Sequence, residues 1–439
     1  GFTEEEVSVW IYDWMNTVYL WNDQIPQNLN PANEPNPVSF FYSLIYEEED
    51  IWSYITDDFE SFKSELAGTP VSMGYSAAFG RYSNTNGVFI IVEYVIPNTP
   101  ASEAGLERGD IIVSINNTEL DTANYRTLYS QESYTAGLAE YDGNDITSTG
   151  ETVNLTAEVI TSSPVIHQEI INYQEEKIGY LVYVDFLSGS NDRFVSQLDE
   201  AFSAFADSAI DELIIDLRYN PGGEVSMASH LASMIAPASA VNSSNVLVSY
   251  IYNDFLNELF LSEGGENSED LNLFFTNPPV NLDMNKVYFM TTSGTASASE
   301  LVITGLDPYM EVTTVGETTF GKYTGAWVLP DSEEPPRHNY AIVPIVLKYA
   351  NSLGITEFVN GLDPDHPIKD QLLGAEPFGS LSDPVLAKTL EVITGVNPSP
   401  ISKKSFERPD YEMIPDRKKI FQKSIQVRRE SMDHIIQKK

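Results

Sequence analysis

Apolar positions in the first 65 residues recur at steps of three and four, which is the period of an amphipathic helix. The residues on this face are Val7, Trp10, Ile11, Trp14, Met15, Val18 and Trp21. Four prolines between positions 26 and 37 interrupt the pattern, and helical spacing resumes over Phe40–Tyr46 and Ile51–Phe62. We interpret Glu47–Asp50 as a solvated acidic turn and the tryptophan-rich face as a packing surface. Residues 1–69 are therefore predicted to form a helical segment.

From Val71 the period changes to two, so short strands and polar turns are expected. Asn144–Thr152 is predicted to be a polar turn, and Val153–Thr161 the last strand of a β-rich domain over residues 70–162. From Lys177 buried strands alternate with helices, which indicates an α/β core over residues 163–400. Its predicted elements are strand Ile178–Val184, helix Phe194–Ala206, strand Leu213–Arg218, strand Val287–Met290, helix Ala296–Leu306, strand Glu311–Val315, strand Tyr340–Tyr349, which Pro344 marks as an edge strand or a bulged one, and helix Asp383–Ile393.

Charge divides the chain into two unequal parts. Lys403–Lys439 carries 11 basic and 6 acidic residues, so this tail has a net charge of +5 while the preceding residues carry −46. So acidic a body repels nucleic acid and anionic lipid, which excludes both as principal partners. The tail from residue 401 has weak helical spacing at its apolar positions Ile420, Phe421, Ile425, Met432 and Ile435. It is expected either to dock on the acidic body or to fray.

Several chemistries are excluded by composition. The chain has no cysteine, so disulfides, thiolate catalysis and Cys-ligated metals are ruled out. Five scattered histidines show no metal-ligand spacing, and neither a metal nor another cofactor is expected. No apolar run reaches the ~18 residues of a transmembrane helix. The opening residues GFTEEE are unlike a signal peptide, and they are compatible with a processed form whose export signal has been removed.

The stretch Lys286–Lys322 contains the residues that best fit a catalytic site. A strand, a polar turn and a helix follow one another, so a serine in the turn lies in the positive field of the helix N-terminus. Free backbone N–H groups at such a site suit an oxyanion. Serine needs an adjacent base, and a lysine serves once burial lowers its pKa. Lys322 follows one strand later, and only seven lysines lie outside the basic tail.

Two strings resemble known families. Pro100-Ala101-Ser102-Glu103-Ala104-Gly105-Leu106 followed by Arg108-Gly109-Asp110 and Ile115-Asn116 closely resembles the mid-domain motif of PDZ domains. Such domains bind a peptide by adding it to a sheet edge and holding its terminal carboxylate with backbone N–H groups. The resemblance makes Met73, Gly74, Tyr75 and Ser76 the carboxylate loop, with a groove-lining helix near Ala123–Ser130. Alternatively, the domain serves only as a regulatory spacer.

Three further motifs, Asp216–Gly223, Ser293–Glu300 and Val315–Lys322, resemble signatures of the C-terminal (tail-specific) processing peptidases of the S41 serine peptidase family. That resemblance covers roughly residues 70–395. It implies a multidomain α/β (α+β) fold with a crotonase/ClpP-like catalytic core behind a PDZ domain. It also implies the site residues: Ser297 as nucleophile, Lys322 as general base, and an oxyanion hole from the N–H of Ala298 and of Gly222 or Gly223.

Structural alternatives exist for the same residues. Ser297 and Glu300 also fit a helix capping box, a role compatible with catalysis, and Ser293 and Ser299 are competing nucleophiles. Many family members carry a glutamine four residues after the lysine, where this chain has Ala326. Tyr323 and Thr324 are the nearby polar candidates to orient Lys322 instead.

The resemblance implies a serine endopeptidase that cleaves proteins or peptides near a free C-terminus. The alternative is a non-catalytic PDZ-containing peptide-binding protein with a degenerate peptidase site, favoured by Ala326. The typical location of members of this family implies a bacterial protein that is exported to the periplasm or the cell surface, with a lipid anchor as one form of attachment. The physiological substrate, the oligomeric state and the direction in which the PDZ domain acts are not given by the sequence.

Overall fold

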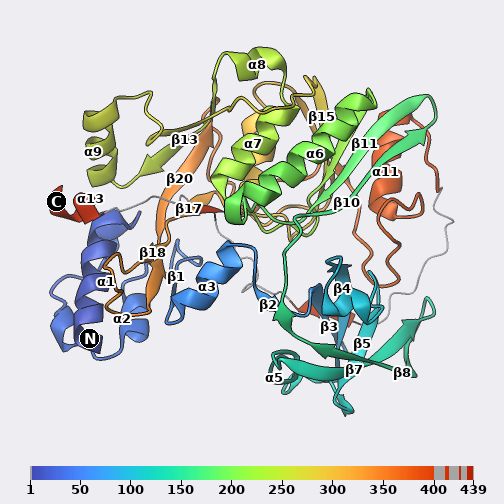
Figure 1. Cartoon of the computed structure of the whole chain (residues 1–439), viewed down its shortest axis with the longest axis horizontal. Coiled ribbons are helices and arrows are strands. Elements are labelled where there is room, and N and C mark those ends of the chain that lie inside the picture. Colours follow the sequence, from blue (N-terminus) through green and yellow to red (C-terminus); the bar gives the residue numbers. More distant parts are fainter. Residues whose placement is uncertain (1, 400–410, 415–424, 427–432, 439) are drawn as a thin grey trace.

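A six-stranded sheet lies at the centre of the computed structural model, which describes residues 2–399, 411–414, 425–426 and 433–438 (Figure 1). Its strands are parallel from β11 onward, and β10 runs antiparallel to β11. In spatial order they are β10 (Val165–Tyr173), β11 (Glu176–Tyr183), β12 (Glu212–Asp216), β15 (Lys286–Thr291), β16 (Glu311–Gly316) and β21 (His366–Pro367). The strands predicted for the α/β core before residue 320 are thereby confirmed.

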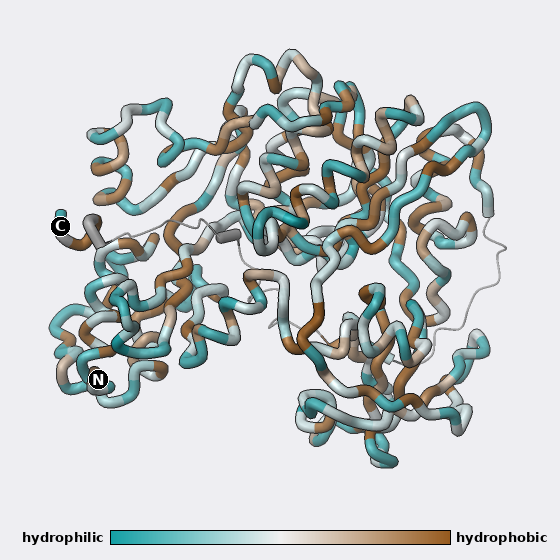
Figure 2. Tube along the Cα trace, viewed as in Figure 1, coloured by the Kyte–Doolittle hydropathy of each residue, from teal (hydrophilic) through white to brown (hydrophobic). Residues whose placement is uncertain are grey.

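Side chains alternate along these strands and build a core on each face of the sheet. Leu213 and Phe289 face helices α6 (Arg193–Asp207), α7 (Val225–Ile235) and α10 (Ala298–Leu306). Ile214 and Met290 face the opposite side, which α11 (Pro384–Thr394) covers. Figure 2 shows hydrophobic residues concentrated along these central strands. The continuous apolar runs in the sequence are typical of strands that are buried on both faces.

A second, five-stranded sheet carries the stretch that follows Lys322. Its order is β14 (Asn272–Phe274), β13 (Val246–Tyr252), β20 (Ile345–Asn351), β17 (Thr324–Ala326) and β23 (Ile425–Gln426). Helices α8 (Ala238–Asn242) and α9 (Asp254–Gly264) flank β13 in the chain. The single strand predicted over Tyr340–Tyr349 is divided at Pro344 into β19 (Ala341–Val343) and β20, which belong to different sheets. Proline cannot donate to a sheet ladder, which explains the break.

The N-terminal segment is only partly helical. It contains α1 (Glu4–Val18), α2 (Pro37–Ser43) and α3 (Phe59–Leu66), with β1 (Tyr54–Thr56) between the last two. The helix predicted over residues 51–62 is therefore wrong before Phe59, because β1 pairs with β19 in a small sheet that β18 (Leu329–Pro330) completes. Sheet pairing with a strand distant in sequence overrides local helical spacing here.

The acidic turn predicted in this segment is also partly wrong. Glu47, Glu48 and Glu49 are exposed, but Asp50 is buried, with 3% of its surface exposed. Its carboxylate accepts hydrogen bonds from the Tyr19 hydroxyl and from the N–H groups of Trp52 and Ser53. These partners replace the water that a buried carboxylate loses.

Residues 71–159 form a separate β-rich unit. Its strands are β2 (Val71–Ser72), β3 (Tyr75–Tyr82), β4 (Val88–Val95), β5 (Ile111–Ile115), β6 (Thr118–Glu119), β7 (Ser133–Tyr141), β8 (Ile146–Thr156) and β9 (Glu158–Val159), and its helices are α4 (Pro100–Glu103) and α5 (Tyr125–Tyr129). The polar turn predicted over residues 144–152 is wrong beyond Asp145, because β7 and β8 continue as a long hairpin in which Tyr141 opposes Ile146. The helix predicted near Ala123–Ser130 is present as α5.

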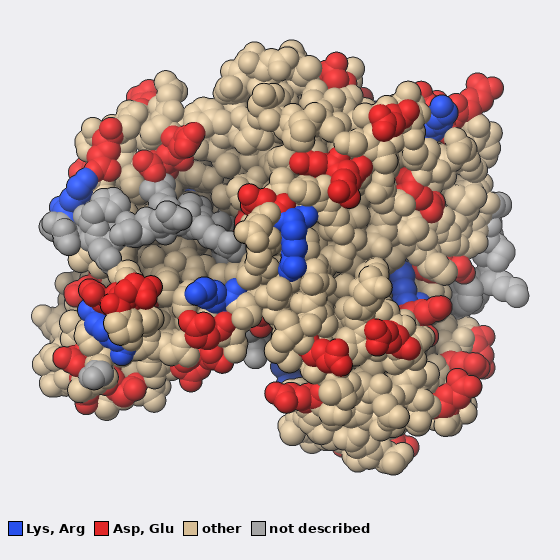
Figure 3. All heavy atoms as spheres, viewed as in Figure 1, with Lys and Arg blue, Asp and Glu red and all other residues tan. Residues whose placement is uncertain are grey.

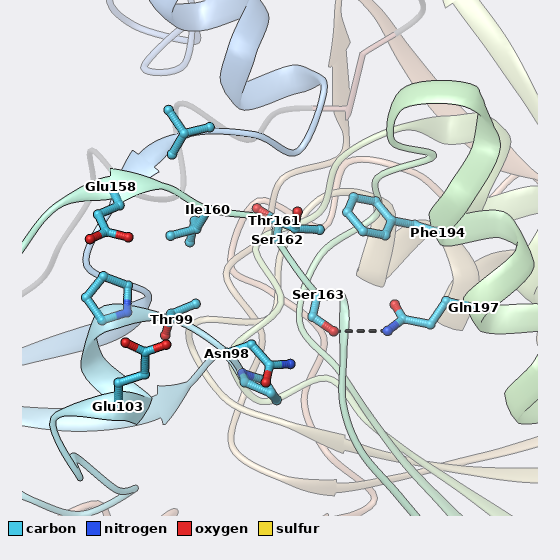
Figure 4. Close-up of a pocket in the computed structure, with 13 residues that line it drawn as sticks. Asn98, Thr99, Glu103, Glu158, Ile160, Thr161, Ser162, Ser163, Phe194 and Gln197 are labelled. Atoms are coloured by element: carbon cyan, nitrogen blue, oxygen red, sulfur yellow. Dashed lines mark hydrogen bonds between the residues drawn. The ribbon is translucent and has the colours of Figure 1, made fainter.

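Arg108 and Arg218 tie this β-rich unit to the core. Arg218 is fully buried and forms ion pairs with Asp216, Asp370 and Asp383 at 2.8–2.9 Å. Arg108, from the β-rich unit, approaches the last two carboxylates at 3.8–3.9 Å. Three carboxylates thus compensate two buried guanidinium groups, as such burial requires. A cavity of about 460 Å³ separates α4 and β9 from α6, where Gln197 donates to Ser163 (Figure 4).

The basic tail docks at three places on the acidic body. β22 (Tyr411–Ile414) pairs with β3, β23 pairs with β17, and α13 (Asp433–Lys438) places Ile435 in the main core. Docking was one of the two expectations for the tail, whereas the helical spacing is wrong at Ile425, which lies in a strand. Ile420, Phe421 and Met432 lie outside the described residues. Figure 3 shows acidic side chains scattered over the visible face of the body and few basic ones.

Candidate active site

Ser297 occupies the turn between β15 and α10, where it is the N-cap of the helix. Its backbone has φ 60° and ψ −114°, close to the first central position of a type II′ turn, which favours glycine. A serine held in such a conformation stores of the order of 1–3 kcal/mol of strain, a feature that clusters at functional sites. The sequence predicted the strand, turn and helix, but it gave no sign of this backbone conformation.

The loop after β12 is hydrogen-bonded to this turn. The Asn220 carbonyl accepts from the Ala296 N–H at 3.1 Å and from the Ser299 hydroxyl at 3.0 Å. The Thr295 hydroxyl donates to the Leu217 carbonyl at 2.8 Å. The Asp216–Gly223 and Ser293–Glu300 motifs, more than 70 residues apart, therefore build one rigid unit.

Gly222 lies directly against Ser297. A Cβ on Gly222 would be 2.7 Å from Ser297 Cβ and 3.0 Å from the Ala298 nitrogen, so only glycine permits this approach. The Gly222 N–H donates to Asn220 Oδ1 at 2.9 Å. In contrast, the N–H groups of Gly223 and Ala298 donate no hydrogen bond to any described residue. Of the two glycine amides considered for an oxyanion hole, that of Gly223 is the one left to receive a ligand.

Glu300 links the turn to Gly321 and Lys322. Its carboxylate is fully buried, and it accepts from the N–H groups of Ser297 (2.8 Å), Gly321 (2.7 Å) and Lys322 (2.8 Å). The Thr319 hydroxyl donates a fourth bond at 2.5 Å. Burial raises the pKa of Glu300, and these four bonds oppose that shift. The residue predicted only as a capping partner therefore also positions the segment that carries Lys322.

Lys322 is fully buried, and its Nζ makes no hydrogen bond with the described residues. Burial lowers the pKa of Lys322 to about 7, although the carboxylates of Asp50 and Glu300 act in the opposite direction. Lysine at such a pKa is largely neutral in mildly alkaline solution and then carries a free electron pair. This is the protonation behaviour that a general base needs near neutral pH.

The backbones of Ser297 and Lys322 meet at two shared groups. One carboxylate oxygen, Glu300 Oε2, accepts from both N–H groups at 2.8 Å. On the other side, the Tyr349 hydroxyl lies 3.3 Å from the Ser297 carbonyl oxygen and 3.5 Å from that of Lys322. The structure thus brings the predicted nucleophile, the predicted base and the predicted amide donors to one buried place.

The competing serines are less suited to this chemistry. Ser293 is exposed in the turn, and Ser299 uses its hydroxyl to donate to the Asn220 carbonyl. Ala326, where many family members have glutamine, is buried in an apolar cluster with Trp52, Val343 and Ile345. The sequence missed Asp50 and Tyr349 as neighbours of the site. No local pattern reveals them, because both reach it through contacts between distant segments.

The remaining predicted residues lie in the β-rich unit. Met73 and Tyr75 line a cavity of about 320 Å³ together with Tyr129 of α5 and Tyr134 of β7. Gly74 has φ 87°, and a Cβ there would lie 2.2 Å from Thr99, so glycine is required. Ser76 donates its hydroxyl to Glu93 at 2.6 Å. This loop stands at the start of β3, beside α5.

Models of known families match three parts of the chain. The model of peptidase family S41 matches residues 177–368, and the peptidase S41 N-terminal domain matches residues 6–54, which together exceed half of the chain. The chain belongs to peptidase family S41. A PDZ domain model matches residues 91–131, which confirms that prediction as well. The mixed α/β class with a PDZ domain and an N-terminal helical segment is likewise confirmed.

Individual relatives of this S41 protein are distant. It is 25% identical over 341 residues to "Carboxyl-terminal-processing peptidase 2, chloroplastic" of Arabidopsis thaliana, covering 75% of this chain and 60% of that protein. It is 25% identical over 337 residues to the carboxyl-terminal-processing protease of Synechocystis, covering 73% and 69%. A crystal structure of a candidate S41 protease from Bacteroides fragilis aligns with TM-score 0.73 and 25% identity, covering 88% of this chain and 97% of that one.

Within residues 2–399 and the described parts of the tail, no three His, Cys, Asp or Glu side chains gather as metal ligands do. Among the same residues, the helices are too short or too polar to cross a membrane.

Glu300→Gln is expected to lower the free energy of unfolding by about 2–4 kcal/mol, because the amide N–H₂ of glutamine would face backbone N–H donors. Urea denaturation of the wild type and the variant measures the difference. Glu311→Gln is the matched control, since the Glu311 side chain is 64% exposed and paired with Lys286. Equal losses in the two variants would contradict the positioning role of Glu300.

Proposed function

We propose that this chain is a serine endopeptidase of the C-terminal processing type, with Ser297 as nucleophile and Lys322 as general base. The observation that supports this most directly is that the Glu300 carboxylate accepts from the backbone N–H groups of both Ser297 and Lys322. Ser297 has a strained backbone, and Lys322 is fully buried, has a lowered pKa, and makes no hydrogen bond through Nζ with the described residues. Ser–Lys pairs are a recognised variant of the catalytic triad.

The proposed reaction is acyl transfer. Neutral Lys322 removes the Ser297 hydroxyl proton as Ser297 Oγ attacks the scissile carbonyl carbon. The N–H groups of Ala298 and Gly223 stabilise the oxyanion of the tetrahedral intermediate. Protonated Lys322 then gives its proton to the leaving amine, which leaves an ester on Ser297. A water deprotonated by Lys322 hydrolyses this ester, and Ser297 is regenerated.

We further propose that Thr324 orients Lys322 in place of the absent glutamine. Thr324 is fully buried, and its Oγ1 has no hydrogen-bond partner among the described residues. It follows Lys322 by two residues in the chain and is the first residue of β17. Tyr323, the other candidate, packs in the apolar cluster and makes an edge-to-face contact with Trp52, with ring centroids 6.1 Å apart. That leaves Thr324 as the better-placed group.

The proposed substrates are proteins with a free C-terminus, held by Met73, Gly74, Tyr75 and Ser76 while a bond nearby is cut. We keep the division at residues 1–69, 70–162, 163–400 and 401–439, and an exported, periplasmic or cell-surface location, as parts of the proposal. A non-catalytic peptide-binding protein would not need a buried Lys322, nor amides at Gly223 and Ala298 that are not hydrogen-bonded to the described residues. This chain has both features.

The test is hydrolysis of an unstructured protein with an apolar C-terminus, followed by electrophoresis across a range of pH. We expect kcat/KM to rise as pH increases through about 7 and to level off above, because the base acts in its neutral form and its pKa is about 7. Activity that falls over this range, or binding of the substrate with no cleavage at any pH, would contradict the proposal.

A further inference from the structure

The outer edge of β3 is the place where a PDZ-type domain adds a peptide strand, and in this chain it is already occupied. β22 pairs antiparallel with β3, so that Tyr411 opposes Tyr82 and Ile414 opposes Phe79. β22 is the outermost strand of that sheet, and β4 lies on the inner side of β3. The chain's own tail therefore takes the position and the strand direction of a bound peptide.

The contacts of β22 are specific. Ile414 packs on the hydrophobic core of the β-rich unit, and Tyr411 packs on the opposite face of the sheet, where its ring lies 5.5 Å from Phe89. Between them Glu412 forms an ion pair with Arg81. Two apolar anchors on opposite faces fix the register, since a slip of one residue would exchange the faces.

β22 covers only the distal part of the proposed peptide site. Residue numbers rise along β22 as they fall along β3, so the tail runs toward the carboxylate loop at Met73–Ser76. The cavity beside that loop is lined by Met73, Tyr75 and Tyr129 and by no residue of β22. A substrate whose carboxylate reached this loop would need the edge of β3 for the residues that precede its terminus.

A second contact of the tail lies next to the proposed base. β23 pairs in parallel with β17, with Ile425 opposite Gly325 and Gln426 opposite Ala326, only a few residues after Lys322. β23 is again the outermost strand of its sheet. Beyond it, α13 is held by Ile435 in the main core and by an ion pair between Lys438 and Glu263.

We propose that the tail is a tethered competitor, which occupies the peptide-binding edge of β3 and the edge of β17 until a substrate's C-terminal segment displaces it. This inference rests on the proposed function, because it concerns access of a substrate to the proposed peptide-binding edge. Charge favours docking, since a tail of net +5 meets a body of −46. Being covalently attached, the tail acts at high effective concentration, so even a weak contact excludes dilute peptides.

The sharpest test is a disulfide between Arg81→Cys and Glu412→Cys, which oppose each other across the strands in a chain with no other cysteine. The background is Ser297→Ala, so that binding is measured without hydrolysis. The probe is a fluorescein-labelled, alanine-rich peptide with a free carboxyl terminus, and its C-terminal amide is the negative probe. We expect the oxidised protein to bind the acid at least about tenfold more weakly than the same protein after reduction.

A pair of point variants tests the same inference without a cross-link. Ile414→Asp removes the anchor on the domain core and is expected to tighten peptide binding by about fivefold to tenfold. Met413→Asp is the matched control, since Met413 is adjacent, apolar and 39% exposed, and it should leave binding within about twofold.

Failure of the disulfide to form, equal peptide affinity before and after reduction, or the same affinity in both aspartate variants would overturn the inference. So would absence of binding even in Ile414→Asp. None of these outcomes bears on whether the active serine cleaves substrate, because the proposed function fails separately through absence of hydrolysis.

Discussion

Ser297→Ala is expected to lower kcat/KM for cleavage of an unstructured protein by a factor of about 10⁴ or more. In the proposed mechanism this change removes the atom that forms the acyl-enzyme, and the proposed oxyanion donors, the amides of Ala298 and Gly223, would alone retain only a small fraction of the rate. Mass spectrometry of the quenched reaction adds a second readout, since the wild type should carry a substrate fragment as an ester and the variant should not.

Ser299→Ala is the matched control for this substitution. It removes a hydroxyl two residues away whose structural partner is the Asn220 carbonyl, so about 1 kcal/mol of stability is lost while the nucleophile remains. Activity within about tenfold of the wild type is expected. Turnover by Ser297→Ala at the wild-type rate would refute the assignment of the nucleophile.

Ser297→Gly adds a stability readout to the same position. Glycine adopts φ 60° and ψ −114° without the strain that serine carries there. The variant should therefore be inactive but no less stable than the alanine variant, which keeps a Cβ in the strained conformation. This ordering follows from the backbone observed in the structure and from no feature of the sequence.

Local order along the chain explains what could be predicted. The strand, turn and helix around Ser297 are contiguous in the sequence, and the spacing of their apolar residues indicates which segment is a strand and which is a helix. The choice between Gly222 and Gly223 was open, although a signal was present. Asn220 stands two residues before Gly222, which is the spacing at which an asparagine side chain accepts from the backbone, and this makes the Gly223 N–H the proposed donor.

Contacts between distant segments explain what could not be predicted. Asp50 ends a run of acidic residues that is typical of a solvated turn, and only the packing of the N-terminal segment against β20 buries it near Lys322. β22 and β23 are short and flanked by charge, so their strand structure comes from the open edges of β3 and β17 rather than from their own propensity.

Lys322→Met is expected to abolish hydrolysis and, at the same time, to stabilise the folded protein. Burial lowers the pKa of Lys322 from 10.5 to about 7, so the folded state binds this proton more weakly than the unfolded chain does. Above pH 10.5 Lys322 is neutral in both the folded and the unfolded state, so its titration costs no folding free energy. As pH falls below 10.5 the unfolded chain takes up the proton first. The free energy of unfolding therefore decreases until pH falls below about 7.

At 1.36 kcal/mol for each pKa unit, this cost is about 2 kcal/mol at pH 9 and about 4 kcal/mol at pH 7. Methionine fills a similar volume without a charge, so urea denaturation should show Lys322→Met more stable by amounts that shrink toward pH 10. Lys348→Met is the matched control, because Lys348 is partly exposed and paired with Glu357. A Lys322→Met protein that is inactive and also less stable at pH 7 would assign this lysine to the structure of the site instead of its chemistry.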